Sequence, residues 1–121
     1  MSFHNLSVGK LGEKIASEYL QKKGFQMVEK NFYCHWGEID IVAKELDKLH
    51  FVEIKTRIGI RMGKPYESVT KPKVKKLMRT IQFYLLNKKL KNYKLSLDVI
   101  SIVLDSQGFV DRLDYFENIT S

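Results

Sequence analysis

Two strand-like segments that carry charged residues constrain the fold of this chain more than any other feature. Glu38–Lys44 and His50–Thr56 are both rich in apolar residues, and successive side chains of a strand point to opposite faces of a sheet. The polar stretch between them, Glu45–Lys48, is too short for a parallel crossover. The two segments are therefore predicted to pair as an antiparallel hairpin with Glu45–Lys48 as its loop.

The length of this loop sets the register of the hairpin. The predicted cross-strand pairs are Lys44–Leu49, Val42–Phe51 and Asp40–Glu53. One sheet face then carries Asp40, Val42, Phe51, Glu53 and Lys55, and the other face of the first strand carries Ile39, Ile41 and Ala43. Directly opposed carboxylates repel each other, and partial burial adds to the cost or raises the pKa of one of them.

A divalent cation or a nearby ammonium group can offset this repulsion. Hard cations such as Mg²⁺, or Mn²⁺ in its place, take oxygen ligands. Asp40 and Glu53 would supply carboxylates, and the carbonyl of Ile54 would add a third oxygen. Lys55 is predicted on the same face, where it would orient a nucleophile or stabilise developing charge in phosphodiester hydrolysis. The alternative is a solvated strand face with cross-strand ion pairs.

Two further glutamates are candidates for the same cluster. Glu13 lies at the edge of the apolar stripe of a predicted helix, beside Gly9 and Ala16, where another element can approach closely. It would complete an acidic cluster with Asp40, or else be an ordinary acid favoured by the helix dipole. Glu38 is a secondary candidate at the strand edge.

The rest of the chain supplies helices and further strands. Apolar residues at helical spacing predict a helix over Val8–Leu20 that ends near Gly24. The other predicted elements are a strand Phe25–Phe32, a connector Tyr33–Gly37, a basic loop Arg57–Glu67, a helix Thr70–Lys89, and strands Leu95–Val103 and Phe109–Phe116. This order predicts one α/β domain over residues 1–121, with a mixed sheet and helices on its faces.

Composition narrows the class of partner. The chain has 121 residues and a net charge of +7, which favours an anionic partner such as nucleic acid. Its single cysteine, Cys34, excludes an internal disulfide and fits a reducing compartment. No apolar run approaches the roughly 18 residues that span a bilayer, and the first residues lack a signal-peptide pattern. A cytoplasmic protein that does not act at a membrane is expected.

Several motifs together resemble the YraN-like family of small bacterial proteins. They are "GKLGEKIASEYLQKKGFQMVEKNF", "GEIDIVAK", "FVEIKTR", "GKPYESVTKPKVKKL" and "LDVISI". The resemblance runs in order from Gly9 to about Ile102 and is specific as a set. The family is similar to archaeal Holliday junction resolvases and to the wider PD-(D/E)XK, restriction-endonuclease-like nucleases.

The resemblance implies a restriction-endonuclease-like fold and a set of site residues. Asp40, Glu53 and Lys55 match the D…E-x-K positions, and Glu13 matches the N-terminal helix glutamate of resolvase-type sites. Asp40 is preceded by Ile39 where the strict motif has proline. Nuclease activity is what the resemblance at these site residues implies.

Basic and aromatic residues near these motifs are candidates for nucleic-acid contact. The predicted phosphate contacts are Arg57, Arg61, Lys64, Lys71 and Lys73, with a solvated surface as the alternative for each. Tyr33, Trp36 and Tyr66 are candidates for stacking on unpaired bases, or else for packing. The histidines His4, His35 and His50 lack ligand-like spacing, and the lone acid Asp98 is given no role.

The sequence as a whole predicts a Mg²⁺- or Mn²⁺-dependent endonuclease acting on branched or otherwise structured DNA, recognised by shape and backbone. A two-fold homodimer would let two sites address two strands. Two alternatives stay open. One is a nucleic-acid-binding or accessory module that keeps the fold without turnover. The other is an interaction protein whose charged hairpin is only a solvated face.

Overall fold

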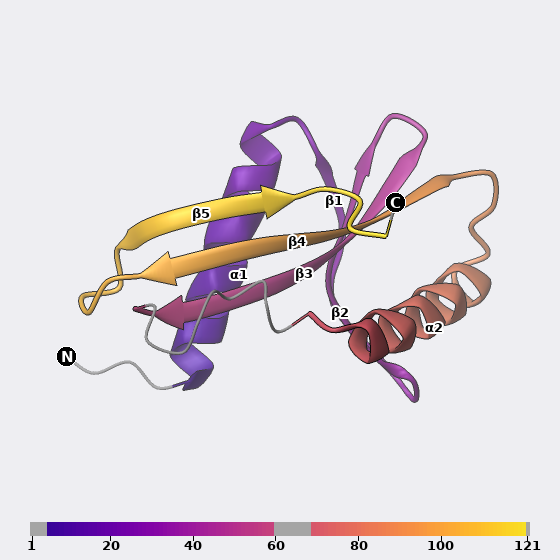
Figure 1. The fold of residues 1–121 in the computed structure, drawn as a ribbon. Coiled ribbons are helices and arrows are strands. Elements are labelled where there is room, and N and C mark those ends of the chain that lie inside the picture. Colours follow the sequence, from indigo (N-terminus) through magenta and orange to yellow (C-terminus); the bar gives the residue numbers. More distant parts are fainter. Residues whose placement is uncertain (1–4, 60–68, 121) are drawn as a thin grey trace.

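Two helices and five strands make up the part of the chain that the structure describes. The structure is a computed structural model, and it describes residues 5–59 and 69–120 (Figure 1). The elements in chain order are α1 (Asn5–Lys22), β1 (Gln26–Cys34), β2 (Gly37–Glu45), β3 (Lys48–Ile58), α2 (Lys71–Asn87), β4 (Lys94–Leu104) and β5 (Val110–Phe116). The predicted order of elements is confirmed. No helix in these residues is long and apolar enough to cross a membrane.

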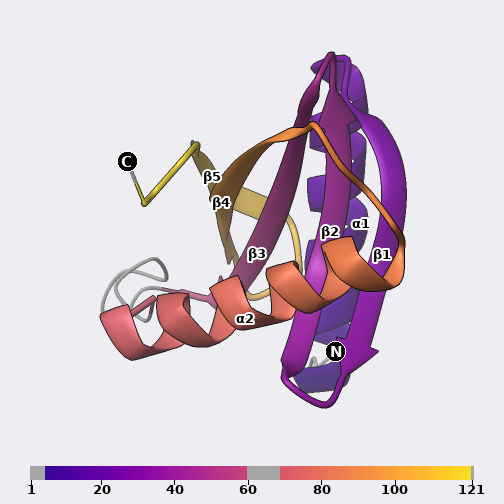
Figure 2. The ribbon, with the colours of Figure 1, turned by 90° about the vertical axis from the view of Figure 1, so that its right-hand side faces the viewer.

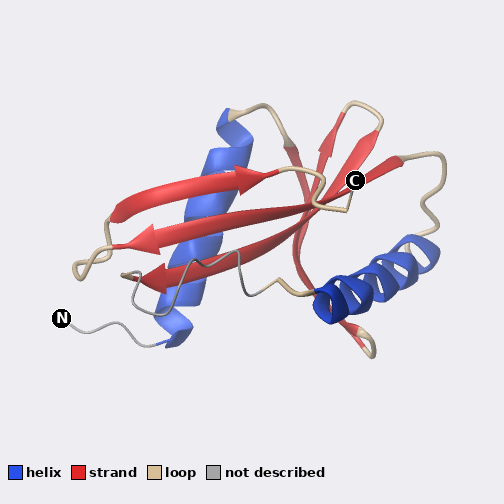
Figure 3. Cartoon of the chain, in the orientation of Figure 1, coloured by secondary structure: helices blue, strands red, loops and turns tan. Residues whose placement is uncertain are grey.

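The strands form one mixed sheet in the order β1-β2-β3-β4-β5 (Figure 3). Only β3 and β4 pair in parallel; the other neighbours are antiparallel. Parallel neighbours need a crossover connection, and α2 provides it between β3 and β4. The sheet is strongly twisted, since β1 and β2 run up the view while β4 and β5 run across it (Figure 1).

The helices cover opposite faces of the sheet, as the side view shows (Figure 2). Alternate residues of β2 and β3 point into two separate apolar layers. The layer under α1 includes Ala16, Leu20, Phe25, Ile41, Ala43, Val52, Ile100, Ile102 and Leu104. The layer under α2 includes Phe32, Ile39, Val42, Leu49, Phe51, Leu77, Ile81, Tyr84 and Leu97. The central strand β3 therefore presents one set of side chains to each layer, which gives the α/β fold with a restriction-endonuclease-like arrangement.

Local sequence explains where the helices begin and end. After Lys22 the chain turns at Gly24, whose φ of +97° is accessible to glycine, and Phe25 N–H donates to the Leu20 carbonyl at 3.0 Å. Thr70 is the N-cap residue of α2, with extended backbone and a proline in the first turn, as predicted.

The hairpin register is confirmed, but its loop is shorter than predicted. Glu45 pairs with Lys48, so the connection is only Leu46 and Asp47 rather than Glu45–Lys48. The pairs Lys44–Leu49 and Val42–Phe51 stand as predicted, because adding a pair at the loop leaves the register unchanged.

Other boundaries also differ from the predictions. The connector predicted over Tyr33–Gly37 narrows to His35 and Trp36, because β1 runs to Cys34 and β2 starts at Gly37. The loop predicted from Arg57 begins later, because Arg57 and the next residue still pair with β4. In both cases ladder hydrogen bonds extend strands into residues whose local composition favours a loop.

The prediction that Ile39 shares a face with Ile41 is wrong. Ile39 packs in the layer under α2, whereas Ile41 packs under α1. The pleat is broken between them: Asn31, between the β1 residues that pair with Ile39 and Ile41, has a φ of +53°, and the ladder to β3 begins only at Ile41. Asp40 lies at this break.

Close packing of α1 on β3 depends on Gly12. A Cβ atom at this position would lie 2.0 Å from Thr56 Oγ1 and 3.0 Å from Thr56 Cβ. A β-branched side chain on a central strand has little freedom to move away. At Gly9, one turn earlier, no atom would lie within 4 Å of such a Cβ.

We expect Gly12→Ala to lower the free energy of unfolding by about 1–3 kcal/mol, because the added methyl group overpacks the helix–sheet contact. Gly9→Ala is the matched control and should be neutral or stabilising by up to about 1 kcal/mol, since it only removes a helical glycine. Urea denaturation measures both. A Gly12→Ala protein as stable as the control would contradict the packing argument, and Thr56→Ala should partly rescue it.

Candidate functional site

The carboxyl groups of Asp40 and Glu53 meet at the break in the hairpin. Asp40 is one residue beyond the Ile41–Val52 pair, so it continues the predicted register toward Glu53. Beyond this pair, a side chain replaces the backbone as hydrogen-bond acceptor: Asp40 Oδ2 accepts a hydrogen bond of 2.8 Å from Ile54 N–H. The two side chains also hydrogen-bond to each other. The predicted Asp40–Glu53 opposition is therefore present as a side-chain contact.

The pKa values of the two carboxyl groups move in opposite directions in this contact, which favours one proton shared between them. Burial raises the pKa of Asp40 to about 8, and the hydrogen bond to Glu53 and its negative charge add to the rise. Burial also acts to raise the pKa of Glu53, but the hydrogen bond from Asp40 and the charges of Lys55 and Lys73 outweigh it and leave that pKa lowered. Near neutral pH Asp40 is thus the protonated partner and Glu53 the ionised one.

Two lysines compensate the charge of Glu53. Lys73 Nζ, from the first turn of α2, lies 3.2 Å from Glu53 Oε2, and Lys55 Nζ lies 3.6 Å from the same atom. Burial and the neighbouring Lys73 lower the pKa of Lys55. For Lys73, burial acts to lower the pKa, but contact with Lys55 and the charge of Glu53 raise it overall. Lys73, predicted to contact phosphate, is thus part of the acidic site itself.

Two neighbouring hollows of about 540 and 480 Å³ lie beside these side chains, and Glu53 and Lys73 line the second of them. Asp40, Ile54 and Lys55 line both of them. The first hollow reaches α1 and is lined there by Glu13, so the predicted approach of this helix glutamate to the Asp40 region is observed. Glu38 lines both hollows too, at the solvent side. The site is therefore accessible to a ligand larger than water.

The basic residues predicted to contact nucleic acid are only partly gathered at this site. Arg57 is half-buried near the end of β3, and Lys71 is exposed and borders a separate hollow with Val74 and Val99. Arg61 and Lys64 lie outside the described residues, as does Tyr66. The structure adds Lys76 and Thr80 of α2 to the lining of the second hollow.

Two predicted aromatic contacts lie at the turn beside the site. Tyr33 is 67% exposed and lines both hollows. Trp36 is 43% exposed, and the Arg79 guanidinium lies 5.8 Å from the centre of its ring. Neither ring is part of the apolar core, so both leave aromatic surface facing solvent.

A buried polar network around Asp98 on β4 was not predicted from the sequence. Asp98 accepts hydrogen bonds from His50 at 2.7 Å, Ser96 at 2.5 Å and Tyr115 at 2.5 Å, and from the Asn118 N–H at 3.0 Å. Burial acts to raise the pKa of Asp98, but these donors outweigh it and lower that pKa. The only sign of this network in the sequence is a single acid within an apolar strand. Its contact with His50 depends on the parallel register of β3 and β4, which a single sequence does not reveal.

We expect metal-free protein to lose stability as pH rises from about 4 to about 8, through Asp40. Folded Asp40 keeps its proton up to a pKa of about 8, whereas an unfolded aspartate releases it near 3.8, so the folded state binds the extra proton between these values. The contribution is complete below pH 4 and is lost as pH passes 8. Asp40→Asn removes it, so the stability of the variant relative to wild type should grow by at least about 1 kcal/mol between pH 5 and pH 8.

Urea denaturation in EDTA at both pH values measures this difference. Asp47→Asn, in the exposed hairpin turn, is the control and should shift neither value. An Asp40→Asn protein whose stability follows the wild-type pH dependence would contradict a shared proton at this pair.

The comparison with known proteins gives a consistent picture of family membership. The model of the uncharacterised protein family UPF0102 matches residues 12–102. A UPF0102 protein of Clostridium acetobutylicum is 40% identical over 114 residues, covering 94% of this chain and 93% of the relative. One of Dictyoglomus turgidum is 38% identical (95% and 98% covered), and one of Clostridium kluyveri is 42% identical (93% and 93% covered). The chain therefore belongs to UPF0102, the YraN family that its motifs resemble.

Proposed function

We propose that this protein is a divalent-cation-dependent endonuclease that hydrolyses phosphodiester bonds in DNA, with Mg²⁺ or Mn²⁺ as the cation. The observation that carries the proposal is the contact between the half-buried Asp40 and the buried Glu53, with Lys55 beside it, at the border of two hollows. Opposed carboxylates cost stability, and such costs are typical of sites that are used for binding or chemistry.

The donor set fits a hard cation. Asp40 and Glu53 offer carboxylate oxygens, and the Ile54 carbonyl is the proposed third ligand, in a site that has room for water and phosphate. When bound, such a cation supplies a Lewis acid that polarises a phosphodiester and acidifies water. Asp40 would give up its shared proton on binding, because a carboxylate coordinates in its ionised form.

The remaining side chains have distinct roles in this proposal. Lys55 lines both hollows and holds its ammonium group beside Glu53, where it would orient the nucleophile or stabilise negative charge on the phosphate. Lys73 holds Glu53 in place and ionised. Glu13, on the α1 side of the first hollow, assists the cation or a water molecule.

Charge and shape support DNA as the substrate. The net charge of +7 favours a polyanion, and exposed Tyr33 beside the site offers a ring for an unpaired base. A chain of 121 residues has little surface for reading base edges, which favours branched or otherwise structured DNA over a defined sequence. Phosphate contacts by Arg57, Arg61, Lys64 and Lys71, a cytoplasmic location and a two-fold homodimer stay predictions.

A non-catalytic nucleic-acid-binding module is the second candidate, and one observation favours it. Glu53 is already compensated by Lys55, by Lys73 and by the proton on Asp40, so the cluster is electrostatically satisfied without a cation. A retained fold with such a cluster would bind DNA through its basic surface and not cut it.

Cleavage of single-stranded, duplex, flap and four-way-junction DNA with Mg²⁺ or Mn²⁺ tests the proposal. We expect wild type to cut at least one structured substrate, and Glu53→Gln and Lys55→Ala each to reduce the rate by about 100-fold or more, because each removes a group acting on the reacting phosphate.

The matched controls are Glu18→Gln on the exposed side of α1 and Lys75→Ala on the exposed side of α2, which should cut like wild type. Binding of the same substrates is measured in parallel without cation. Binding without cleavage, unchanged by either site substitution, would favour the non-catalytic module. Loss of activity in the controls as well would contradict the assigned site.

A further inference from the structure

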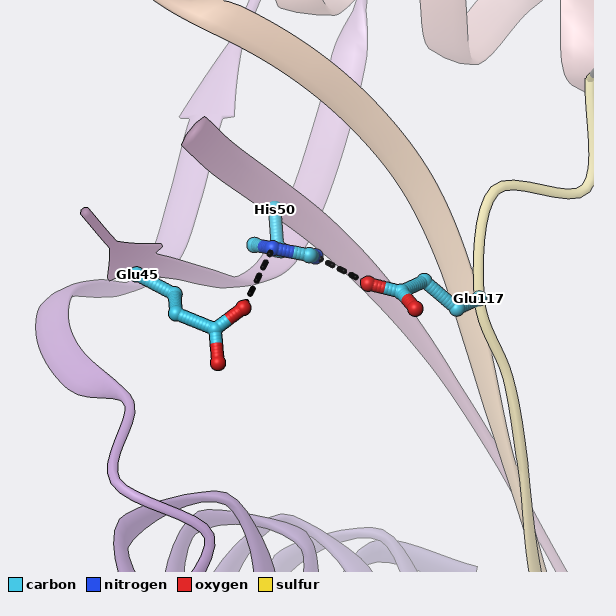
Figure 4. A group of neighbouring side chains, drawn as sticks. All are labelled: Glu45, His50 and Glu117. Carbon is cyan, nitrogen blue, oxygen red and sulfur yellow. Dashed lines mark ion pairs between the residues drawn. The ribbon is translucent and has the colours of Figure 1, made fainter. Parts of the chain in front are cut away.

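A second group of metal-ligating side chains lies away from the Asp40–Glu53 site. Glu45 ends β2, His50 lies on β3 and Glu117 directly follows β5 (Figure 4). One ligand atom from each of the three lies within 4.8 Å of the other two. Among the described residues this is the one such group of three or more, and the proposed function uses none of it.

His50 brings an unsatisfied nitrogen to this group. Its side chain is 0% exposed, and Nε2 is buried without a hydrogen-bond partner. Phe25 packs against the imidazole with the two ring planes at 90° and the ring centres 4.8 Å apart, so an apolar ring borders the histidine. Buried polar atoms are almost always paired, so an orphaned ring nitrogen indicates a missing partner.

Asp98 orients the imidazole for ligation. His50 Nδ1 lies 2.7 Å from Asp98 Oδ2, while Ser96 and the Asn118 N–H hold the other carboxylate oxygen. In a neutral imidazole, a carboxylate that accepts the Nδ1 proton leaves Nε2 as the unprotonated nitrogen. This is the arrangement in which a second carboxylate typically supports a metal-binding histidine.

The carboxylates of Glu45 and Glu117 both lie near ring nitrogens of His50, and an ionised carboxylate can only accept hydrogen bonds. Glu45 Oε1 lies 4.0 Å from His50 Nε2, and Glu117 Oε2 lies 3.8 Å from Nδ1, both beyond hydrogen-bond distance. Figure 4 shows the two carboxylates approaching the ring from opposite sides. Both side chains are 46% exposed, so they are free to adjust and a solvent ion can reach them. Within the described residues, neither forms an ion pair with lysine or arginine.

We propose that Glu45, His50 Nε2 and Glu117 bind one divalent transition-metal ion of the Zn²⁺ class. Ligand atoms of a tetrahedral zinc site lie about 3.4 Å apart, against a present spacing of up to 4.8 Å, so the two half-exposed glutamates would rotate inward, Glu117 from the Nδ1 side of the ring, to reach an ion at Nε2. Imidazole nitrogen favours such an ion over Mg²⁺, which prefers oxygen alone. The ion would join the ends of β2 and β5 to β3, and water would complete its coordination.

Zn²⁺ titration by calorimetry of the full chain, after treatment with EDTA, tests this site. The parent protein carries Asp40→Asn and Cys34→Ser, so that the other carboxylate pair and the half-exposed thiol are not ligands. We expect one Zn²⁺ per chain, about tenfold weaker binding in Glu45→Gln or Glu117→Gln, and about 100-fold weaker binding when both are changed. Glu18→Gln is the control and should bind like the parent.

The ¹⁵N resonances of the histidine rings identify the ligand directly. Addition of Zn²⁺ should shift Nε2 of His50 and leave Nδ1 protonated toward Asp98, whereas a tenfold excess of Mg²⁺ should shift neither. The proposal is overturned if the parent binds no Zn²⁺, if the double glutamine variant binds it equally well, or if His50 Nε2 is unaffected. None of these results depends on nuclease activity, so a failure of the zinc proposal is distinguishable from a failure of the proposed function.

Discussion

The parallel pairing of β3 with β4 is the interaction on which the rest of the structure depends. It runs without interruption from Lys48–Lys94 to Ile58–Leu104 and places β3 at the centre of the sheet, with β2 on its other side. A strand in this position is shielded on both faces, by α1 and by α2. The two buried polar side chains of β3, His50 and Glu53, therefore need partners, and these partners define both charged clusters described above.

The Asp40–Glu53 pair illustrates how such a need is met. The left-handed Asn31 and the end of the β2–β3 ladder break the pleat at Asp40, which turns its carboxyl toward Glu53 and the Ile54 amide. Burial makes two adjacent carboxylate charges costly. A proton on Asp40 removes one of these charges, and Lys55 and Lys73 compensate the remaining charge on Glu53. In the proposed function, a cation would take the place of this shared proton beside Glu53.

Much of this could be predicted from sequence, and the failures have physical causes. Periodicity and the short polar loop were enough for the element order, the hairpin register and the meeting of Asp40 with Glu53. The face of Ile39 was missed because alternation assumes an unbroken pleat, and the break comes from β1. The role of Asp98 was missed because its donors come from β3, from β5 and from the residues after β5. The entry of Lys73 into the acidic site depends on how α2 docks, which no local pattern encodes.

The sequence alone determined the local features: which segments are helices or strands, where Gly24 ends α1, and which carboxylates oppose each other, because these follow from neighbouring residues and short loops. Only the tertiary structure decided which side chains meet across long separations. The parallel register between β3 and β4 set the Asp98–His50 contact, and the close approach of α1 at Gly12 set the position of Glu13 at the hollow. Such contacts arise from packing of whole layers, whose energy is shared among many residues and is not carried by any one stretch of the chain.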